Sequence, residues 1–410
     1  MKSVVDLPFN EFIEKIVADL GETNPESDDY SIIENTAKHL KNLENAYSKL
    51  AKYSDKKKLA SSGVEWFLDN YFVIQKAIEI IRDDLPEEYF NKLPSVKDRS
   101  NLPRIYHIAK YLVKYFEIEL VLGNLDQFLS AFQKHIDLHM SELWALPLML
   151  RLVLVEALSD SINDLVGDVQ PVGLVRGLEF SNISSDEIIA RSLRTLLFFD
   201  RLNWLKFFEA HSQVDKKLRE DPSGTYAGMD FETRDLYRNK IEYFAEHSAF
   251  NEVEVAQIAV ELAINSPKDQ EHTRHVGFYL LDEGEDKLKQ RIDYKANYSD
   301  KLKSFFFAHN ASFYLGSITL ITILATLGMV VFSRVVISIT WHWVLIGLAS
   351  LIPASSVAVN LVNTLLTTTL PPKTLPKMDF RKAVPRQFRS VVVIPAIFSH
   401  CDELEFLLQQ

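Results

Sequence analysis

Apolar residues recur every three or four positions along most of the first 300 residues of this 410-residue chain. The repeat is plain in Leu112–Leu122 and Leu146–Leu158, and this spacing gathers apolar side chains on one face of an α-helix. The chain has only 13 glycines, and prolines such as Pro86 and Pro103 stand where helices are expected to begin or end. No strand-like alternation and no Asn-Gly turn interrupts the series. The pattern therefore predicts a helical domain over residues 1–300, with ten to fourteen helices and a candidate subdivision near residues 168–175.

The pattern changes after Lys303. Between Phe305 and Leu370 the only charged residue is Arg334, and two stretches, Ala311–Phe332 and Trp341–Leu370, carry no charge. A helix of about 20 apolar residues crosses a bilayer. Two buried helices of a soluble core are the alternative, but such helices seldom lack charge for so long. Residues 305–370 are therefore predicted to form a transmembrane hairpin in contact with the lipid bilayer.

Charge beside the hairpin predicts its orientation. Two lysines, Lys301 and Lys303, precede the first span, whereas the turn between the spans offers only Arg334. Basic residues prefer the cytoplasmic side of a membrane, so both termini are expected in the cytoplasm. The residues that follow the second span are also basic, against the single acid Asp379: Lys373, Lys377, Arg381, Lys382, Arg386 and Arg389.

The last residues change character again. Residues 371–388 read as a basic linker, and Arg389–Pro395 is rich in β-branched residues that suit a buried strand of a parallel sheet. A helix start is expected at Asp402. Because a βαβ unit needs about thirty residues, residues 389–410 are interpreted as the truncated start of an α/β domain. The predicted fold class is thus mainly α: a large cytosolic helical domain, a two-helix transmembrane hairpin, and the first strand and helix start of a truncated α/β domain.

Composition limits the chemistry. The net charge of −11 argues against a general nucleic-acid-binding role, and the single cysteine, Cys401, fits a reducing compartment. The pair His135 and His139 has the i, i+4 spacing of a helical metal site, but no third ligand is spaced to join it. The group Glu271, His272 and His275 is interpreted in the same way, as ordinary surface or core residues.

Two groups of charged residues fall within predicted helices. The run Asp215–Asp221 is expected to be a solvated, ion-paired helix face. Arg151 and Glu156 interrupt an apolar helix, and they are either a paired buried charge or residues of its wet face. Phosphate-binding glycine loops and a nucleophile elbow are absent from the sequence. No catalytic, cofactor-binding or metal-ligating residue is predicted in this chain.

Several spaced blocks of the sequence, in order from about residue 60 to the end, resemble the N-terminal part of the bacterial cyclic β-1,2-glucan synthases, which are large inner-membrane glycosyltransferases. The blocks are Trp66–Tyr71, Arg82–Pro86, Glu142–Arg151, Asn203–Phe208, Arg219–Tyr226, Met229–Asp235, His275–Gly284, Leu370–Phe380 and Val391–Pro395.

The resemblance implies glucosyl transfer from UDP-glucose in the full-length protein, with a divalent metal, in the bacterial inner membrane. It makes Val391–Pro395 the first strand of the glycosyltransferase domain, and that missing downstream domain becomes an expected partner. Glucan is a further expected contact near the hairpin, where Phe332, Trp341 and Trp343 would either stack on sugar or lie at the lipid interface.

The sequence departs from the family where catalysis would occur. The DxD-type metal motif and the QxxRW-like acceptor motif are both absent. The chain is therefore expected to be inactive alone, as an anchoring and regulatory part of a synthase. The alternative is a free-standing helical membrane interaction protein, derived from a disrupted synthase.

Overall fold

The computed structural model describes residues 4–21, 23–24, 31–53, 61–96, 102–166, 180, 183–267, 269–297, 309–336, 340–369, 375–381, 383–391 and 393. These residues form seventeen α-helices and one pair of two-residue strands, which confirms the mainly α class. Fifteen of the helices precede residue 300. This is one more than the ten to fourteen predicted, because several of them are only five to seven residues long. They are divided between two compact units, each described by itself.

Unit 1 comprises Met1–Glu220 and Ile241–Asn265. Its antiparallel strands β1 (Thr23–Asn24) and β2 (Ser95–Val96) pair with each other. Its helices are α1 (Phe9–Leu20), α2 (Ser31–Tyr53), α3 (Ser62–Asp69), α4 (Tyr71–Asp84), α5 (Glu87–Asn91), α6 (Arg104–Tyr115), α7 (Leu122–Phe132), α8 (Met140–Val166), α9 (Ser185–Phe199), α10 (Trp204–His211), α11 (Gln213–Leu218), α13 (Glu252–Ile264) and the end of α12 (Phe231–Glu246) from Ile241 on.

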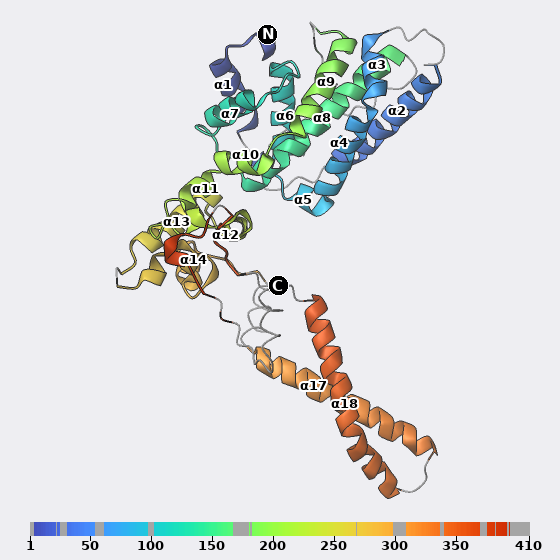
Figure 1. The fold of residues 1–410 in the computed structure, drawn as a ribbon, viewed down its shortest axis with the longest axis vertical. Coiled ribbons are helices and arrows are strands. Elements are labelled where there is room, and N and C mark those ends of the chain that lie inside the picture. Colours follow the sequence, from blue (N-terminus) through green and yellow to red (C-terminus); the bar gives the residue numbers. More distant parts are fainter. Residues whose placement is uncertain are drawn as a thin grey trace, which may run out of the picture. The chain divides into compact units, whose positions relative to one another are not determined.

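Helix α8 forms the centre of unit 1. It packs against α6, α9, α2 and α4 (Figure 1). Apolar side chains on all its sides, among them Met149, Leu150 and Val153, are fully buried, and each such burial contributes about 1.5–3 kcal/mol. The predicted helix over Leu146–Leu158 is thus confirmed. The candidate subdivision near residues 168–175 lies outside the described residues.

The helix expected over Leu112–Leu122 is interrupted. Helix α6 ends at Tyr115 and α7 begins at Leu122; between them Glu117 and Ile118 adopt φ angles of 47° and 74°. This left-handed conformation costs about 1–2 kcal/mol for each such residue. The apolar repeat continues across the break, because nothing local, neither glycine nor proline, marks it.

Unit 2 comprises Asp221–Lys240 and Ser266–Gln410. It contains α12 as far as Lys240 and the helices α14 (Val276–Leu281), α15 (Glu285–Arg291), α17 (Asn310–Val336) and α18 (Thr340–Thr369), with short 3₁₀ turns at Tyr226–Gly228, Glu271–Arg274 and Arg386–Phe388.

Helices α17 and α18 lie side by side as a hairpin (Figure 1). The stretches Asn310–Ser333 and Trp341–Thr369 are long and apolar enough to cross a membrane, and their apolar windows are only 0% and 17% buried. Core helices of a soluble protein would be covered by protein, so the burial favours the transmembrane alternative. Ala354 and Ala358 of α18 are buried, and the Tyr314 hydroxyl of α17 donates to Asn363 Oδ1 of α18 at 3.0 Å. α18 continues through Pro353.

The chain after the hairpin does not form the predicted strand in the described residues. Arg389–Val391 and Val393 have no regular structure, and Val391 and Val393 are 88% and 79% exposed. A strand exists only when its backbone groups pair with a neighbour, and no described residue pairs with this stretch. The expected helix start at Asp402 and the residue Cys401 lie outside the described part of the chain.

Candidate functional site

Three polar side chains of unit 2 are linked in series by hydrogen bonds, and we call them the polar chain. His275 Nδ1 lies 2.9 Å from Asp221 Oδ2, and His275 Nε2 lies 2.9 Å from the Tyr237 hydroxyl. His275 stands at the start of α14, Tyr237 lies on α12, and Asp221 is the first residue of the unit. With Nδ1 donating to the carboxylate, Nε2 accepts the proton of the tyrosine hydroxyl. Both ring nitrogens are therefore satisfied by protein.

Asp221 joins this chain to the backbone around it. Its Oδ1 accepts the Val276 N–H at 3.0 Å, and its Oδ2 accepts from the Ser223 hydroxyl at 2.6 Å and the Tyr226 N–H at 3.3 Å. Although burial opposes ionisation, hydrogen bonds from His275, Ser223 and the Val276 N–H lower the pKa of Asp221. Burial, with the charges of Asp221 and Asp282, raises the pKa of Tyr237. At neutral pH the polar chain thus has an ionised Asp221 on one side of the His275 ring and a protonated Tyr237 on the other.

This arrangement braces the unit and does not activate a nucleophile. The Ser223 hydroxyl lies 3.2 Å from His275 Nδ1, the same nitrogen that faces Asp221. In a hydrolytic triad the serine and the aspartate engage opposite ring nitrogens, and here Tyr237 holds the other nitrogen. The packing at the Tyr237 hydroxyl is tight, since a Cβ at Gly277 would lie 2.2 Å from it.

A cleft of about 1320 Å³ opens beside the polar chain. It lies entirely within unit 2 and is lined by three stretches that are distant in sequence. The first is the loop and helix from Pro222 to Tyr237, the second runs from Glu271 to Asp282, and the third is Leu375–Met378.

The third stretch belongs to what we call the return segment, Leu375–Asp379, the first described residues after the hairpin. Its backbone is hydrogen-bonded to the start of α12 and the turn before it. The Lys377 carbonyl accepts the Asp230 N–H at 3.0 Å, the Asp379 N–H donates to the Gly228 carbonyl at 2.9 Å, and the Lys377 N–H donates to Thr233 Oγ1 at 2.9 Å. The chain that leaves the hairpin is thereby attached to the same unit that precedes the hairpin.

The histidine groups considered from the sequence are placed differently from one another. His135 and His139 lie in the loop between α7 and α8, not on a helix, and the His139 ring is 3.5 Å from Glu252. His272 and His275 border the cleft. In the described part of the chain, no three His, Cys, Asp or Glu side chains are arranged to hold a metal ion.

The run Asp215–Asp221 differs from the solvated face expected of it. α11 ends at Leu218, and the carboxylates of Asp215 and Asp221 are buried. Ion pairs do form, between Asp215 and Arg219 at 2.6 Å and between Lys217 and Glu220 at 3.2 Å. Asp221 was missed as a site residue because its partner His275 is 54 positions away, and local charge patterning carries no signal of that distance.

For Arg151 and Glu156 the buried alternative holds. Arg151 is 5% exposed, with a guanidinium nitrogen 3.6 Å from Asp200. The Glu156 carboxylate accepts from the Tyr106 hydroxyl at 2.9 Å and lies 3.8 Å from Lys110 Nζ. Burial raises the pKa of Glu156. Each charge joins α8 to a different neighbouring helix.

Comparison with known proteins places the chain among relatives. No family model matches it. A similar protein is the cyclic β-(1,2)-glucan synthase NdvB of Rhizobium meliloti (strain 1021), which is 26% identical over 426 residues; the alignment covers 83% of this chain. The chain is related to the cyclic β-(1,2)-glucan synthases. It spans 15% of the length of that synthase. Four of the blocks that resemble these synthases surround the cleft: Arg219–Tyr226, Met229–Asp235, His275–Gly284 and Leu370–Phe380.

Proposed function

We propose that this chain is a membrane-anchoring and regulatory part of a cyclic β-1,2-glucan synthase, in which the full-length protein transfers glucose from UDP-glucose. The relationship to such synthases supports a glucan synthase activity for the full-length protein. The attachment of the return segment to unit 2 supports the role. Unit 2 holds the chain both before the hairpin and, through the return segment, after it. The position from which the chain continues after Asp379 is therefore fixed. The helical unit therefore sets the orientation of whatever the synthase places there.

The proposed topology has both flanks of the hairpin in the cytoplasm of a bacterial inner membrane. Basic residues flank the spans, and the positive-inside rule places such residues in the cytoplasm. The return segment adds support, since its hydrogen bonds to Gly228, Asp230 and Thr233 require the end of α18 to lie on the same side of the membrane as the start of α12. A reporter enzyme fused after Arg334 is expected to be active outside, and one fused after Arg389 inside.

The chain is further proposed to transfer no glucose on its own. Carboxylates would have to hold a divalent ion against the diphosphate of UDP-glucose, and the sequence offers no DxD-type motif for this. Membranes that contain only this chain should incorporate no labelled glucose from UDP-glucose. Labelled glucan in that assay would refute the proposal of inactivity.

The regulatory role is tested by loosening the return segment in the full-length synthase. Thr233→Val removes the side chain that accepts the Lys377 N–H. Thr195→Val is the matched control, because it removes a comparable bond, at 2.7 Å to the Ile118 carbonyl in unit 1. Glucan synthesis in isolated membranes should fall severalfold for Thr233→Val and stay near the parent level for Thr195→Val, with equal amounts of membrane-inserted protein. Equal activity of both variants would refute the regulatory role of the return segment.

A further inference from the structure

We infer that the cleft of unit 2 binds a neutral oligosaccharide. The inference names a ligand for the proposed regulatory site, and it rests on the proposed function for its role in the synthase. The side chains that line the cleft support it by their hydrogen-bonding groups, their charge and their apolar surface.

The first step is an unsatisfied donor. The Arg274 Nε atom is buried and has no hydrogen-bond partner among the described residues, and Arg274 lines the cleft. A buried donor without a partner costs about 1–3 kcal/mol. The carboxylates of Glu271 and Asp282 line the same cleft. Arg274, Glu271 and Asp282 thus place donor and acceptor side chains in the same lining, which suits a ligand whose hydroxyl groups both donate and accept.

The second step is the charge balance. The cationic side chains of the lining are Arg274 and Lys377, and the anionic ones are Glu271 and Asp282. Two positive charges against two negative charges leave no net positive potential. Lys377 Nζ is moreover 3.7 Å from the Glu232 carboxylate. Phosphate recognition relies on an excess of Arg, Lys or helix N-terminal charge. The balance therefore disfavours a nucleotide or sugar phosphate and favours an uncharged ligand.

The third step is shape and apolar surface. The volume of about 1320 Å³ exceeds the roughly 300–1,000 Å³ of sites for drug-sized ligands, so several sugar rings fit. Phe278 contributes aromatic surface to the lining, beside Leu236 and Leu281. The C–H faces of a pyranose pack on such surfaces while its hydroxyl groups reach the polar side chains.

An occupant would contact the return segment as well. Lys377 and Met378 form one wall of the cleft, and the segment is held there by the hydrogen bonds of Lys377 to Asp230 and Thr233 and of Asp379 to Gly228. A ligand that touches both walls stabilises the attached state of the segment. Binding of oligosaccharide is thereby linked to the chain that leaves the membrane.

Binding is tested on the full chain in lipid nanodiscs, because glycoside detergents would compete for the site. Saturation-transfer NMR measures β-1,2-, β-1,4- and α-1,4-linked gluco-oligosaccharides, with UDP-glucose and inorganic phosphate as anionic probes. At least one neutral oligosaccharide should bind, and the anions should not. Arg274→Gln and Asp282→Asn should each weaken binding about tenfold, which corresponds to about 1.4 kcal/mol. Glu283→Gln is the matched control, since Glu283 is an exposed acid next to Asp282 outside the lining.

A second readout follows the return segment directly. In a Cys401→Ser background, maleimide labelling of Met378→Cys should slow when the oligosaccharide is present. Binding of only the anionic probes, no binding at all, or equal binding by the two lining variants and the control would each overturn the inference. These measurements use no glucan synthesis, so their failure is separate from failure of Thr233→Val to alter the synthase.

Discussion

Two helices of equal length meet opposite surroundings in this protein. α8 and α17 each have 27 residues, and both are apolar on all sides. α8 is buried by other helices of unit 1, whereas residues of α17 such as Leu315, Leu320 and Leu324 are 59–61% exposed. A helix that is apolar all round needs either protein or lipid around it, and the two helices represent the two solutions.

Their charges distinguish the two cases. α8 carries Glu142, Arg151, Glu156 and Asp160 within its length, and protein helices supply partners for its buried charges. Glu142 is bound by Arg104, with Nε to Oε1 at 2.8 Å. α17 has no charged residue before Arg334, which suits the proposed membrane span, because lipid supplies no partner for a charge. A charge inside an apolar helix is therefore the sign of a protein environment.

The largest expected effect breaks the buried pair on α8. Glu142→Gln leaves the Arg104 guanidinium, which is 2% exposed, without its counter-ion, and the free energy of unfolding should fall by about 3–5 kcal/mol. Denaturant unfolding of the chain in nanodiscs measures it. Glu220→Gln, in an exposed pair with Lys217, is the control and should cost less than about 1 kcal/mol. Equal losses would mean that the burial of the pair is unimportant.

Placing a charge on α17 should give the next largest effect. Leu324→Lys puts an ammonium group in the middle of the proposed span, at a cost of about 2.5–3.5 kcal/mol for insertion. Leu205, on α10, is similarly exposed at 47%, against 59% for Leu324, so Leu205→Lys should leave insertion and stability nearly unchanged. The fraction of chain that resists carbonate extraction reports insertion. Full insertion of Leu324→Lys would argue that α17 lies in water.

The smallest effect is a pH dependence that belongs to α8. Burial, together with the charge of Asp164, raises the pKa of Asp160 to about 6. A carboxyl group with a raised folded-state pKa stabilises the fold most below its unfolded pKa of about 3.8, and this stability is lost as pH rises through about 6. Between those limits, unfolding free energy should fall by about 1–2 kcal/mol. Asp160→Asn should remove that slope in denaturant titrations, while insertion of the hairpin should not change with pH. An unchanged slope in the variant would assign the dependence to other groups.

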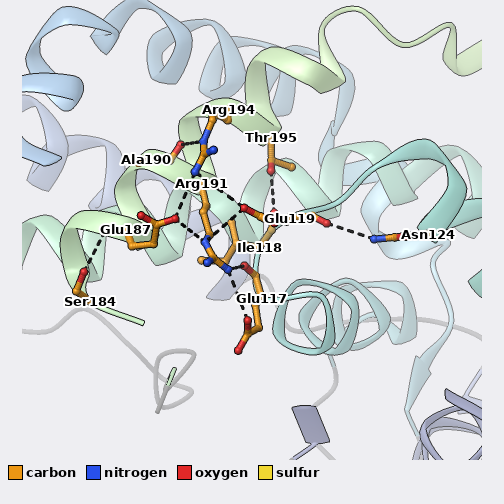
Figure 2. A network of polar contacts seen from close by, with 10 residues as sticks. All are labelled: Glu117, Ile118, Glu119, Asn124, Ser184, Glu187, Ala190, Arg191, Arg194 and Thr195. Carbon is orange, nitrogen blue, oxygen red and sulfur yellow. Dashed lines mark hydrogen bonds and ion pairs between the residues drawn. The ribbon is translucent and has the colours of Figure 1, made fainter. Parts of the chain in front are cut away.

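The break between α6 and α7 shows what local sequence lacks. Figure 2 shows Arg191 of α9 reaching the turn: its guanidinium donates to the Glu117 carbonyl at 3.1 Å and pairs with Glu187 at 2.8 Å. Thr195 donates to the Ile118 carbonyl at 2.7 Å (Figure 2). The bonds to the two carbonyls stabilise Glu117 and Ile118 in the left-handed conformation, which is especially unfavourable for the β-branched Ile118. They come from more than 70 positions away, so no local pattern predicts them.

The sequence by itself determined the helical class and the hairpin, because hydrophobic periodicity and long uncharged runs are local properties that any surroundings must accommodate. It also carried the relationship to the glucan synthases. Only the tertiary structure decided that Asp221 meets His275 and Tyr237, that Arg151 is buried and Glu156 half-buried, and that the return segment lies on α12. These outcomes depend on side chains far apart in the chain, and distance in sequence has no local signature.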